Sequence, residues 1–164
     1  MVGAGDIADC RYEHVNRTAD LLDNIPGSVF TTGDNAYEWG TAEEFQNCYE
    51  PTWGRQKSRT RPAHGDHDYE RQNATGYFGY FGAVAGDPNK GYDSYDLGDW
   101  HIVVFNSNCS KIGGCSLGSD QDLWLPANIA ANPSVCTLAY WHHPRFSSGL
   151  HGSDEGTVDF WQAL

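Results

Sequence analysis

Four short strand-like segments of this chain each run directly into acidic or histidine residues, and this repeated ending is the feature that most constrains the fold. The four blocks are Asp6, Asp34, Asp66-His67-Asp68 and His142, and each follows an apolar or extended stretch. In open α/β sheets, ligands bind outside the carboxyl ends of the strands. The pattern therefore predicts a sheet that brings these side chains to one edge.

The rest of the chain alternates predicted strands with predicted helices. Helices are expected over His14–Leu22, from Thr41 through Tyr49, from Ser119 through Ala131, and over Asp154–Leu164. The segments GYDSYDL and WHIVVFNSN predict paired strands joined by a hairpin turn at Gly98-Asp99. This alternation predicts an α/β fold in which a mixed sheet is layered with helices. A chain of 164 residues suits one domain spanning residues 1–164.

Local signals add detail to three of these segments. Thr41 and Glu44 form a capping box at the start of the second helix. Pro126 is expected to interrupt the third helix, because proline lacks the backbone N–H that a helix interior requires. Residues 76–87 are rich in Gly, Tyr and Phe without a clean period. They predict an irregular, aromatic-packed loop with one helical turn.

Charge and hydropathy exclude two classes of protein. Ten Lys and Arg residues against 22 Asp and Glu residues give a net charge of -12, a field that repels nucleic-acid phosphates. The same charge suits cation capture, although a plainly acidic soluble surface explains it equally. No apolar run approaches the roughly 20 residues of a membrane span, and no basic and apolar leader begins the chain. We therefore expect a soluble protein that binds neither nucleic acid nor membrane, with no signal peptide in this chain.

The five cysteines include no CxxC pair, which argues against a structural zinc ribbon. Their number favours an oxidising compartment, with one thiol left unpaired. Cys10 and Cys48 flank the loops that carry the first two blocks, so we expect a disulfide between them. Cys109 and Cys115 flank a Gly-rich loop typical of disulfides, and pairing of Cys136 with either of them is a second expectation.

The residue types in the four blocks suit a metal site. Carboxylate oxygens and imidazole nitrogens together form the oxygen and nitrogen ligand sets that many metals take. One Gly-Asp after a strand is ordinary turn chemistry, whereas four such blocks in order indicate a site. His67 alone, between two acids, reads as a solvated surface residue. The blocks around it favour a chemical role instead.

The order GDIADC, GDNAY, GDHDYE and WHHPRFSSGLHG resembles the calcineurin-like metallophosphoesterases, particularly their purple acid phosphatase-like branch. The blocks of that family read GD, GDxxY, GNH followed by an acid, HxP and finally GHxH, and the first four occur here in order. The resemblance covers nearly all of the chain. It implies a sandwich of two mixed β-sheets flanked by helices, incomplete here at the C-terminus.

The resemblance implies two metal ions and their ligands. Asp6 would bind the first metal, Asp34 would bridge both, and Tyr37 would give the first metal a phenolate. Asp66 and His142 would bind the second metal. The implied cofactors are divalent or trivalent transition metal ions, namely iron, zinc or manganese.

Two histidines would serve the substrate by the same resemblance. His67 would steady the phosphoryl group or its leaving oxygen, and His151, nine residues after His142, would face the substrate. We interpret His143 as a packing residue or a support for a ligand, and Arg145 as part of a surface ion pair, with substrate contact as the alternative.

The implied chemistry is hydrolysis of small phosphoric esters. Two metals about 3.5–4 Å apart clamp a phosphate and lower the pKa of a bridging water, which gives a hydroxide near neutral pH. That hydroxide attacks phosphorus in line, and a histidine protonates or hydrogen-bonds the leaving oxygen. The resemblance therefore implies a metal-dependent phosphatase, a phosphoric ester hydrolase with a dinuclear site.

The sequence departs from the family pattern at three places. GHxH is absent, because the chain stops before the strand that would carry it, so both metal sites are short of histidine. Ala8 stands where many relatives have a histidine ligand, and Asp66 replaces the usual asparagine. A carboxylate adds negative charge beside an anionic substrate and cannot donate as an amide does. These departures bear on activity more than on metal binding, and they leave the activity of this truncated chain open.

Two hypotheses from different classes follow. The leading one is a metal-dependent phosphoric ester hydrolase, present as a partial catalytic domain. The alternative is a catalytically impaired metal-binding or secreted recognition domain on the same scaffold. A carbohydrate-binding module would rest only on the content of Trp and Tyr. The cysteines favour a secreted or extracytoplasmic protein for either hypothesis.

Overall fold

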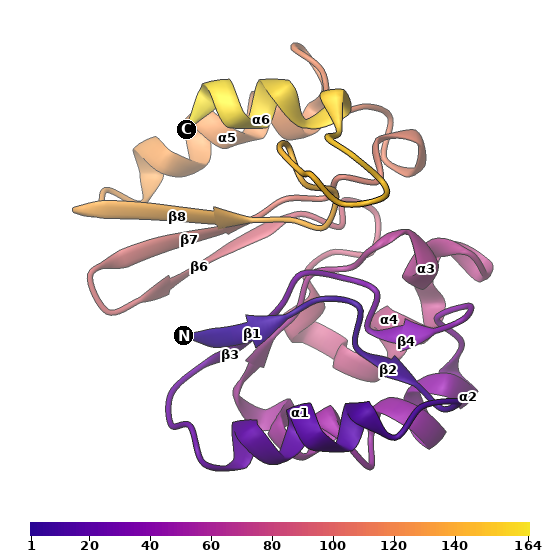
Figure 1. The fold of residues 1–164 in the computed structure, drawn as a ribbon. Coiled ribbons are helices and arrows are strands. Elements are labelled where there is room, and N and C mark those ends of the chain that lie inside the picture. Colours follow the sequence, from indigo (N-terminus) through magenta and orange to yellow (C-terminus); the bar gives the residue numbers. More distant parts are fainter. The chain divides into compact units, whose positions relative to one another are not determined.

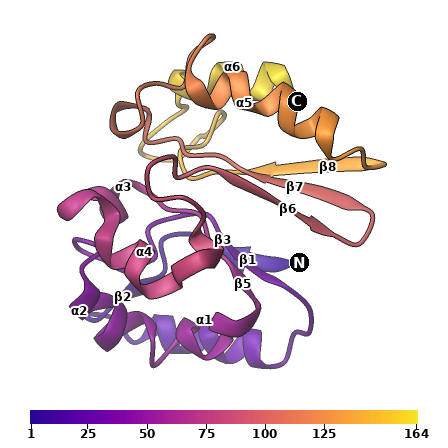
Figure 2. The same ribbon diagram turned by 180° about the vertical axis from the view of Figure 1, so that it is seen from behind.

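The computed structural model describes residues 1–164, with the exception of the side chain of Gln72. The chain forms two compact units, Met1–Ala85 and Gly86–Leu164, and each is best followed by itself in Figure 1 and Figure 2. Across the described residues, the elements are helices and three small sheets. The predicted α/β class is therefore confirmed. The expectation of a single domain over 1–164 stays a prediction.

The first unit is built on short parallel strands. β1 (Val2–Ala4), β3 (Val29–Thr31) and β5 (Thr60–Arg61) form one sheet in the order β1-β3-β5, and β2 (Ala8–Asp9) pairs with β4 (Ala36–Tyr37). Every one of these pairings is parallel. Because parallel strands end at the same edge of a sheet, the loops that follow β1, β3 and β5 leave from one side.

Helices fill the connections between these strands. In α1 (His14–Asp23), the apolar residues Val15, Ala19 and Leu22 are buried, as their spacing predicts. The other helical segments are α2 (Ala42–Glu44), a π-helix (Phe45–Tyr49), a 3-10 helix (Trp53–Arg59), α3 (Asp66–Tyr69), a 3-10 turn (Gln72–Ala74), α4 (Thr75–Phe81) and a 3-10 turn (Gly82–Ala85).

The predicted capping box at the start of α2 is confirmed. The Glu44 N–H donates to Thr41 Oγ1 at 3.2 Å, and the Glu44 carboxylate accepts from the Thr41 N–H at 2.9 Å. The same carboxylate accepts from the N–H groups of Glu38 and Trp39, so it also fixes the segment that follows β4. Helical structure continues to Tyr49, as expected.

Residues 76–87 are helical over most of their length, which corrects the expected irregular loop. Tyr77 and Phe81 lie four residues apart in α4, and both are buried. Gly76 is needed at the start of this helix, because a Cβ there would lie 2.0 Å from the carbonyl oxygen of Gly40. Burial of these aromatic rings stabilises the helix. The stretch is too short for a helical period to be recognised in the sequence.

The second unit is one mixed sheet covered on one face by helices (Figure 1). Its elements are β6 (Asp93–Leu97), β7 (Trp100–Val104), α5 (Asp120–Ala131), β8 (Cys136–Tyr140), a 3-10 turn (Glu155–Thr157) and α6 (Val158–Ala163). β6 and β7 form the predicted hairpin across Gly98, and β8 runs parallel to β7. Phe105 after β7 and Phe160 of α6 stack with ring centroids 4.4 Å apart in the core beneath the helices.

Pro126 does not interrupt α5, contrary to the expectation from the sequence. A proline in a helix interior costs about 3 kcal/mol. The helix persists because its N-terminal turn and its inner face are held. Ser119 Oγ accepts from the Asp122 N–H at 3.3 Å at the N-terminus, Leu125 is buried in the core, and the Gln121 side chain exchanges two hydrogen bonds with the backbone of Asn106.

Two disulfides are present. Cys10–Cys48 is the predicted one and joins the loop after β2 to the π-helix. Cys109 pairs with Cys115, so the expected pairing of Cys136 with either residue is wrong. The reason is local, since Cys109 and Cys115 are only six residues apart and close the Gly-rich loop on themselves. Two disulfides indicate an oxidising environment.

Among the described residues, no helix combines the length and the apolar character that crossing a membrane requires.

Candidate metal centre

Two aspartates occupy equivalent turns at the ends of neighbouring parallel strands. Asp6 follows β1 with φ 56°, and Asp34 follows β3 with φ 52°. Aspartate tolerates this left-handed conformation better than most side chains, because its short polar side chain can bond locally. The two turns are joined, since the Asp6 N–H donates to the carbonyl of Gly33 at 3.1 Å and the Ile7 N–H donates to that of Asp34 at 2.9 Å. The predicted convergence of these two acids is present.

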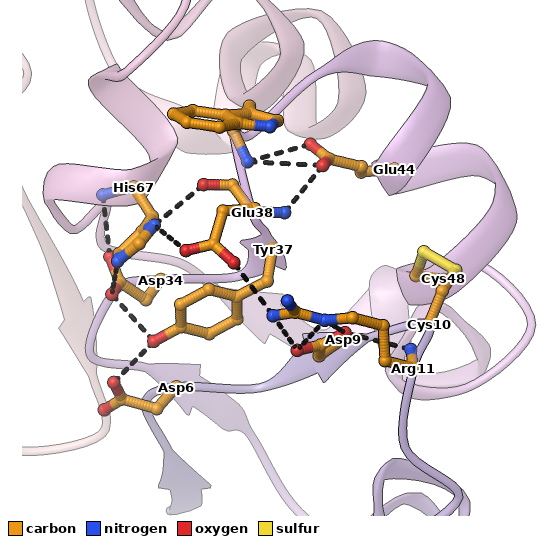
Figure 3. Close-up of polar contacts among 11 residues, drawn as sticks. Asp6, Asp9, Cys10, Arg11, Asp34, Tyr37, Glu38, Glu44, Cys48 and His67 are labelled. Atoms are coloured by element: carbon orange, nitrogen blue, oxygen red, sulfur yellow. Dashed lines mark hydrogen bonds and ion pairs between the residues drawn. A yellow bond between two sulfur atoms is a disulfide. The ribbon is translucent and has the colours of Figure 1, made fainter.

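The hydroxyl of Tyr37 lies between the two aspartates (Figure 3). It is 2.6 Å from Asp6 Oδ1 and 2.8 Å from Asp34 Oδ2. Burial raises the pKa of the Tyr37 phenol well above its ordinary value, and the neighbouring carboxylates of Asp6 and Asp34 raise it further. Tyr37 therefore holds its proton and shares it between two carboxylate oxygens.

These three oxygens fit a cation. Two carboxylates and one phenol converge from the ends of β1 and β3 and from β4, and the phenol hydroxyl contacts both carboxylates. Asp34 is 2% exposed, so its charge is poorly screened by water. A hard, highly charged metal ion takes this oxygen set, and its charge offsets the repulsion between the acids. Asp6, Asp34 and Tyr37 are the residues that would hold it.

His67 is held next to the carboxylate of Asp34. α3 begins at Asp66, and the His67 N–H donates to Asp34 Oδ1 at 3.1 Å. His67 Nδ1 lies 2.7 Å from the carbonyl oxygen of Glu38, which can only accept, so Nδ1 carries a proton. His67 Nε2 is then the nitrogen that lies 3.9 Å from Asp34 Oδ2. The ring also packs against Tyr37, with centroids 4.6 Å apart.

The environment of His67 favours its charged form. Burial lowers the pKa of the imidazole, but the hydrogen bond to the Glu38 carbonyl and the charges of Asp34, Asp66 and Glu38 raise it by more. The pKa of His67 is therefore above its ordinary value. A solvated surface histidine makes no such set of contacts, and His67 is a fixed part of this group of side chains.

Gly65 permits the close approach of α3 to Asp34. A Cβ at position 65 would lie 2.0 Å from Asp34 Oδ1 and 2.6 Å from the Asp34 backbone nitrogen. No shift of a flexible side chain relieves a contact with the backbone. Glycine is therefore required here by the distance between the two loops, rather than by the turn alone.

Asp68 and Asn35 hold together the loops that carry Asp34 and His67. The sequence predicts no role for Asn35, and it places Asp68 in a block without a role of its own. The Asp68 carboxylate is fully buried and accepts from the Gly65 N–H at 2.9 Å, the Asn35 N–H at 3.2 Å and Asn35 Nδ2 at 3.0 Å. Burial raises the pKa of Asp68 to about 7, against the lowering effect of these bonds. The available signal was an acid three residues after Gly65, where a helix N-terminus needs an acceptor.

Arg11 and Glu38 lie beside Tyr37 (Figure 3) and are joined by an ion pair. The sequence predicts no role for either residue. Arg11 Nη2 lies 2.6 Å from Asp9 Oδ2 and 2.8 Å from Glu38 Oε2, beside the Cys10–Cys48 disulfide (Figure 3). A hollow of about 490 Å³ is lined in part by Arg11, Glu38 and Tyr37. The ring of Tyr37 therefore borders both the carboxylates and an open space.

The predicted site residues divide between the two units. Asp6, Asp34, Tyr37 and His67 come together in the first unit, and Asp66 is the exposed first residue of α3 in that unit. His142 and His151 lie in the second unit, after β8, and their part in a metal centre stays a prediction. Their unit also contains the expected surface ion pair of Arg145, which lies 3.0 Å from Glu155.

In comparisons with known proteins, the chain matches no protein-family model, and it matches no curated protein.

Proposed function

We propose that this chain is a calcineurin-like metallophosphoesterase of the purple acid phosphatase-like branch, which hydrolyses small phosphoric esters with two transition metal ions. The observation that supports this most is the Tyr37 hydroxyl, 2.6 Å and 2.8 Å from the carboxylates of Asp6 and Asp34. Motif resemblance alone selects these three residues. Their convergence from separate strands is an independent geometric property, and it suits a metal-binding role.

Each side chain has a task in this proposal. Asp6, Asp34 and Tyr37 would hold the first metal, which would be iron, zinc or manganese, and by the resemblance Asp34 would also be a ligand of the second. By the resemblance alone, Asp66 and His142 would be the ligands of the second metal. Two bound metal ions would neutralise the phosphate and activate the attacking water. The finer fold, a sandwich of two mixed sheets flanked by helices, belongs to the same proposal.

His67 acts on the substrate rather than on the metals. Its Nδ1 is occupied by the Glu38 carbonyl at 2.7 Å, so the ring presents Nε2 on the side of Asp34. The pKa of His67, raised above the ordinary value, favours a proton on that nitrogen. His67 can then donate to a phosphoryl oxygen or to the leaving alkoxide, which is general acid catalysis. By the resemblance, His151 is the second histidine that faces the substrate.

The substrate is a small phosphoric ester outside the cytoplasm. The hollow of about 490 Å³ beside Tyr37 suits the organic part of such an ester. Nucleic acid is an unsuitable partner because of the net charge of -12. The two disulfides support secretion or an extracytoplasmic location.

One observation favours a second candidate, a metal-binding or secreted recognition domain with impaired catalysis. Asp66 is an exposed carboxylate where the family has an amide, and it adds negative charge close to where an anionic ester would bind. The first metal site is unaffected by this change. The second candidate therefore keeps metal binding and loses turnover.

A metal-binding and hydrolysis experiment tests both candidates. The chain is loaded with iron, zinc or manganese, its metal content is measured after dialysis, and an aryl phosphate is offered as substrate. Asp34→Asn is the test variant, since asparagine also tolerates φ 52° and leaves the turn intact. Glu70→Gln is the control, because it removes an exposed charge in the same region.

The outcomes separate the candidates. Metal-dependent hydrolysis that falls by about a hundredfold or more in Asp34→Asn and persists in Glu70→Gln supports the phosphoesterase. Metal binding that requires Asp34 without hydrolysis supports the impaired domain. If neither the chain nor the control retains metal, both candidates are wrong. His67→Ala should lower turnover while the metal content stays nearly unchanged.

A further inference from the structure

A second hollow of the first unit, the Arg71 hollow, is lined by Trp39 and Arg71. It measures about 600 Å³, and its other lining residues are two threonines and three small residues. Trp39 is 42% exposed, so a large part of its side chain faces open space. Trp39 also lines the hollow of about 490 Å³ beside Tyr37. One exposed indole therefore borders both hollows.

The two hollows differ in the charge of their lining. Four acids and the cation Arg11 line the hollow beside Tyr37, the acids being Asp9, Glu38, Glu43 and Glu44. The described residues that line the Arg71 hollow include one cation and no acid. In a chain with 22 acidic and 10 basic residues, this lining is locally positive on an acidic molecule. The Arg71 hollow therefore favours an anionic group over a cationic one.

The side chain of Arg71 contacts the indole of Trp39 rather than a carboxylate. Its guanidinium carbon lies 4.7 Å from the ring centroid, within the range of a cation–π contact. In the part of the chain that the structure describes, this side chain makes no ion pair and no hydrogen bond. Arg11 and Arg55, by contrast, each pair with two acids. A guanidinium over a ring face keeps N–H donors at its edge, so Arg71 can bind a carboxylate or a phosphate with two parallel hydrogen bonds.

The backbone that carries Trp39 is fixed next to the candidate metal centre. The Glu44 carboxylate accepts from the N–H groups of Glu38 and Trp39, at 2.6 Å and 3.1 Å. The carbonyl oxygen of Glu38 lies 2.7 Å from His67 Nδ1 (Figure 3). Gly40 packs against α3, since a Cβ there would lie 2.9 Å from the carbonyl oxygen of His67. Residues 38–40 therefore form one short, fixed segment between His67 and the Arg71 hollow.

We propose that the Arg71 hollow binds a second anionic group of the substrate, a carboxylate or a phosphate, while the ester phosphate lies at the metal centre. This rests on the proposed function, which assigns the ester phosphate to the metals held by Asp6, Asp34 and Tyr37. The part of the substrate between the two anions passes along Trp39, which lines both hollows. An aromatic group gains most from contact with an indole. The substrate class is therefore an aromatic phosphoric ester with a second acidic group.

Anion binding by the metal-free chain tests the Arg71 hollow by itself. Benzoate and phenyl phosphate are titrated separately, and NMR of the Trp39 indole N–H reports binding. We expect saturable shifts that weaken as salt is added. Arg71→Gln should weaken binding by about tenfold or more, because hydrogen bonds to a charged group are lost. Arg17→Gln, which changes an exposed arginine of α1, is the matched control and should bind as the parent does.

The two probes also identify the second anion. A saturable response to benzoate supports the proposal with a carboxylate as that group, and a response to phenyl phosphate supports it with a phosphate. No saturable response to either probe overturns the proposal. Equal binding by the parent and Arg71→Gln also overturns it.

Hydrolysis by the metal-loaded chain tests the part of Arg71 in substrate choice. Phenyl phosphate is compared with carboxyphenyl phosphate, and the ratio of their kcat/KM values is measured. The parent should prefer the carboxylated ester, and Arg71→Gln should lower the ratio by about tenfold, while Arg17→Gln keeps it. An unchanged ratio in Arg71→Gln contradicts the proposal. Anion binding at Arg71 without hydrolysis of either ester would overturn the proposed function and leave the anion site standing.

Discussion

The imidazole of His101 on β7 lies 2.7 Å from the carboxylate of Asp96, its cross-strand partner on β6. Its other ring nitrogen lies 2.8 Å from Asn128 Oδ1, and Asn128 Nδ2 donates to Ser94 Oγ, which fixes the amide orientation. Both ring nitrogens thus face acceptors, an arrangement that only the protonated imidazole satisfies fully.

We predict that the stability of the second unit falls as the pH rises past the pKa of His101. Burial lowers the pKa of His101, but the bonds to Asp96 and Asn128 raise it by more, so the folded pKa exceeds the ordinary 6.5. The stabilisation is fully present at a pH below the pKa of His101 in the unfolded state. It is lost as the pH rises through the pKa of His101 in the folded state. Urea unfolding between about pH 6 and about pH 8 measures this. His101→Gln should remove that loss, whereas the exposed His14→Gln should keep it.

Gly65→Ala should disrupt the candidate metal centre, because the new Cβ would lie 2.0 Å from Asp34 Oδ1. Loss of stability by about 2 kcal/mol or more and loss of metal binding are expected. Gly79→Ala is the matched control: it adds the same methyl group within α4, where nothing lies within 4 Å. That variant should gain about 0.5–1 kcal/mol. Equal metal binding by the two variants would contradict the assignment.

Tyr37→Phe tests the phenol as a ligand. With iron(III) bound, a phenolate ligand gives a visible charge-transfer absorption, and the variant should lack it. Metal affinity should also fall by about tenfold, since one of three converging oxygens is lost. Tyr12→Phe, which changes an exposed tyrosine, should retain both properties. An unchanged absorption in Tyr37→Phe would show that the hydroxyl only braces the two acids.

Removing the Cys10–Cys48 disulfide should destabilise the first unit and loosen the loop that carries Arg11. A double Cys10→Ser, Cys48→Ser variant is expected to lose about 2–4 kcal/mol of unfolding free energy. Cys136→Ser, which changes the unpaired cysteine, should lose much less. Thermal unfolding of the two variants side by side gives the comparison. Equal stability of both would mean that the bridge does not form in solution.

Asp66→Asn should strengthen anion binding by the metal-loaded chain. The substitution removes one negative charge at the first residue of α3 and restores an amide donor. We expect inorganic phosphate to bind about fivefold more tightly, after screening by metal and water reduces the direct Coulomb effect. Calorimetric titration with phosphate measures this, with Glu70→Gln as the charge-matched control. Weaker phosphate binding in Asp66→Asn would argue that the carboxylate itself is needed.

Local signals predicted the local elements well. The capping box of Thr41 and Glu44 and the buried face of α1 each depend on residues within one helix, and both are present. The Cys10–Cys48 bridge was also predictable, because each cysteine lies next to a recognisable block. Pro126 shows the limit of local rules, since contacts made elsewhere by Gln121 and Leu125 keep its helix intact.

The candidate site was predictable only in part, for the same reason. Asp6, Asp34, Tyr37 and His67 follow from the motif blocks. The role of Asp68 depends on its carboxylate reaching Asn35, which is 33 positions away in the sequence. The pairing of Ser107 with His143 spans 36 positions. Asp68, Asn35 and His143 lie within the motif blocks, but no spacing rule joins the two residues of either pair.

The left-handed turns at Asp6 and Asp34 limit how this chain could evolve. At φ 56° and φ 52°, the residues that fit with little strain are aspartate, asparagine and glycine. Codons for the latter two differ from an aspartate codon by a single nucleotide. A lineage that gave up these carboxylates would therefore be expected to drift to asparagine or glycine, and one further mutation would restore them. The backbone thus keeps the loss of the carboxylates reversible.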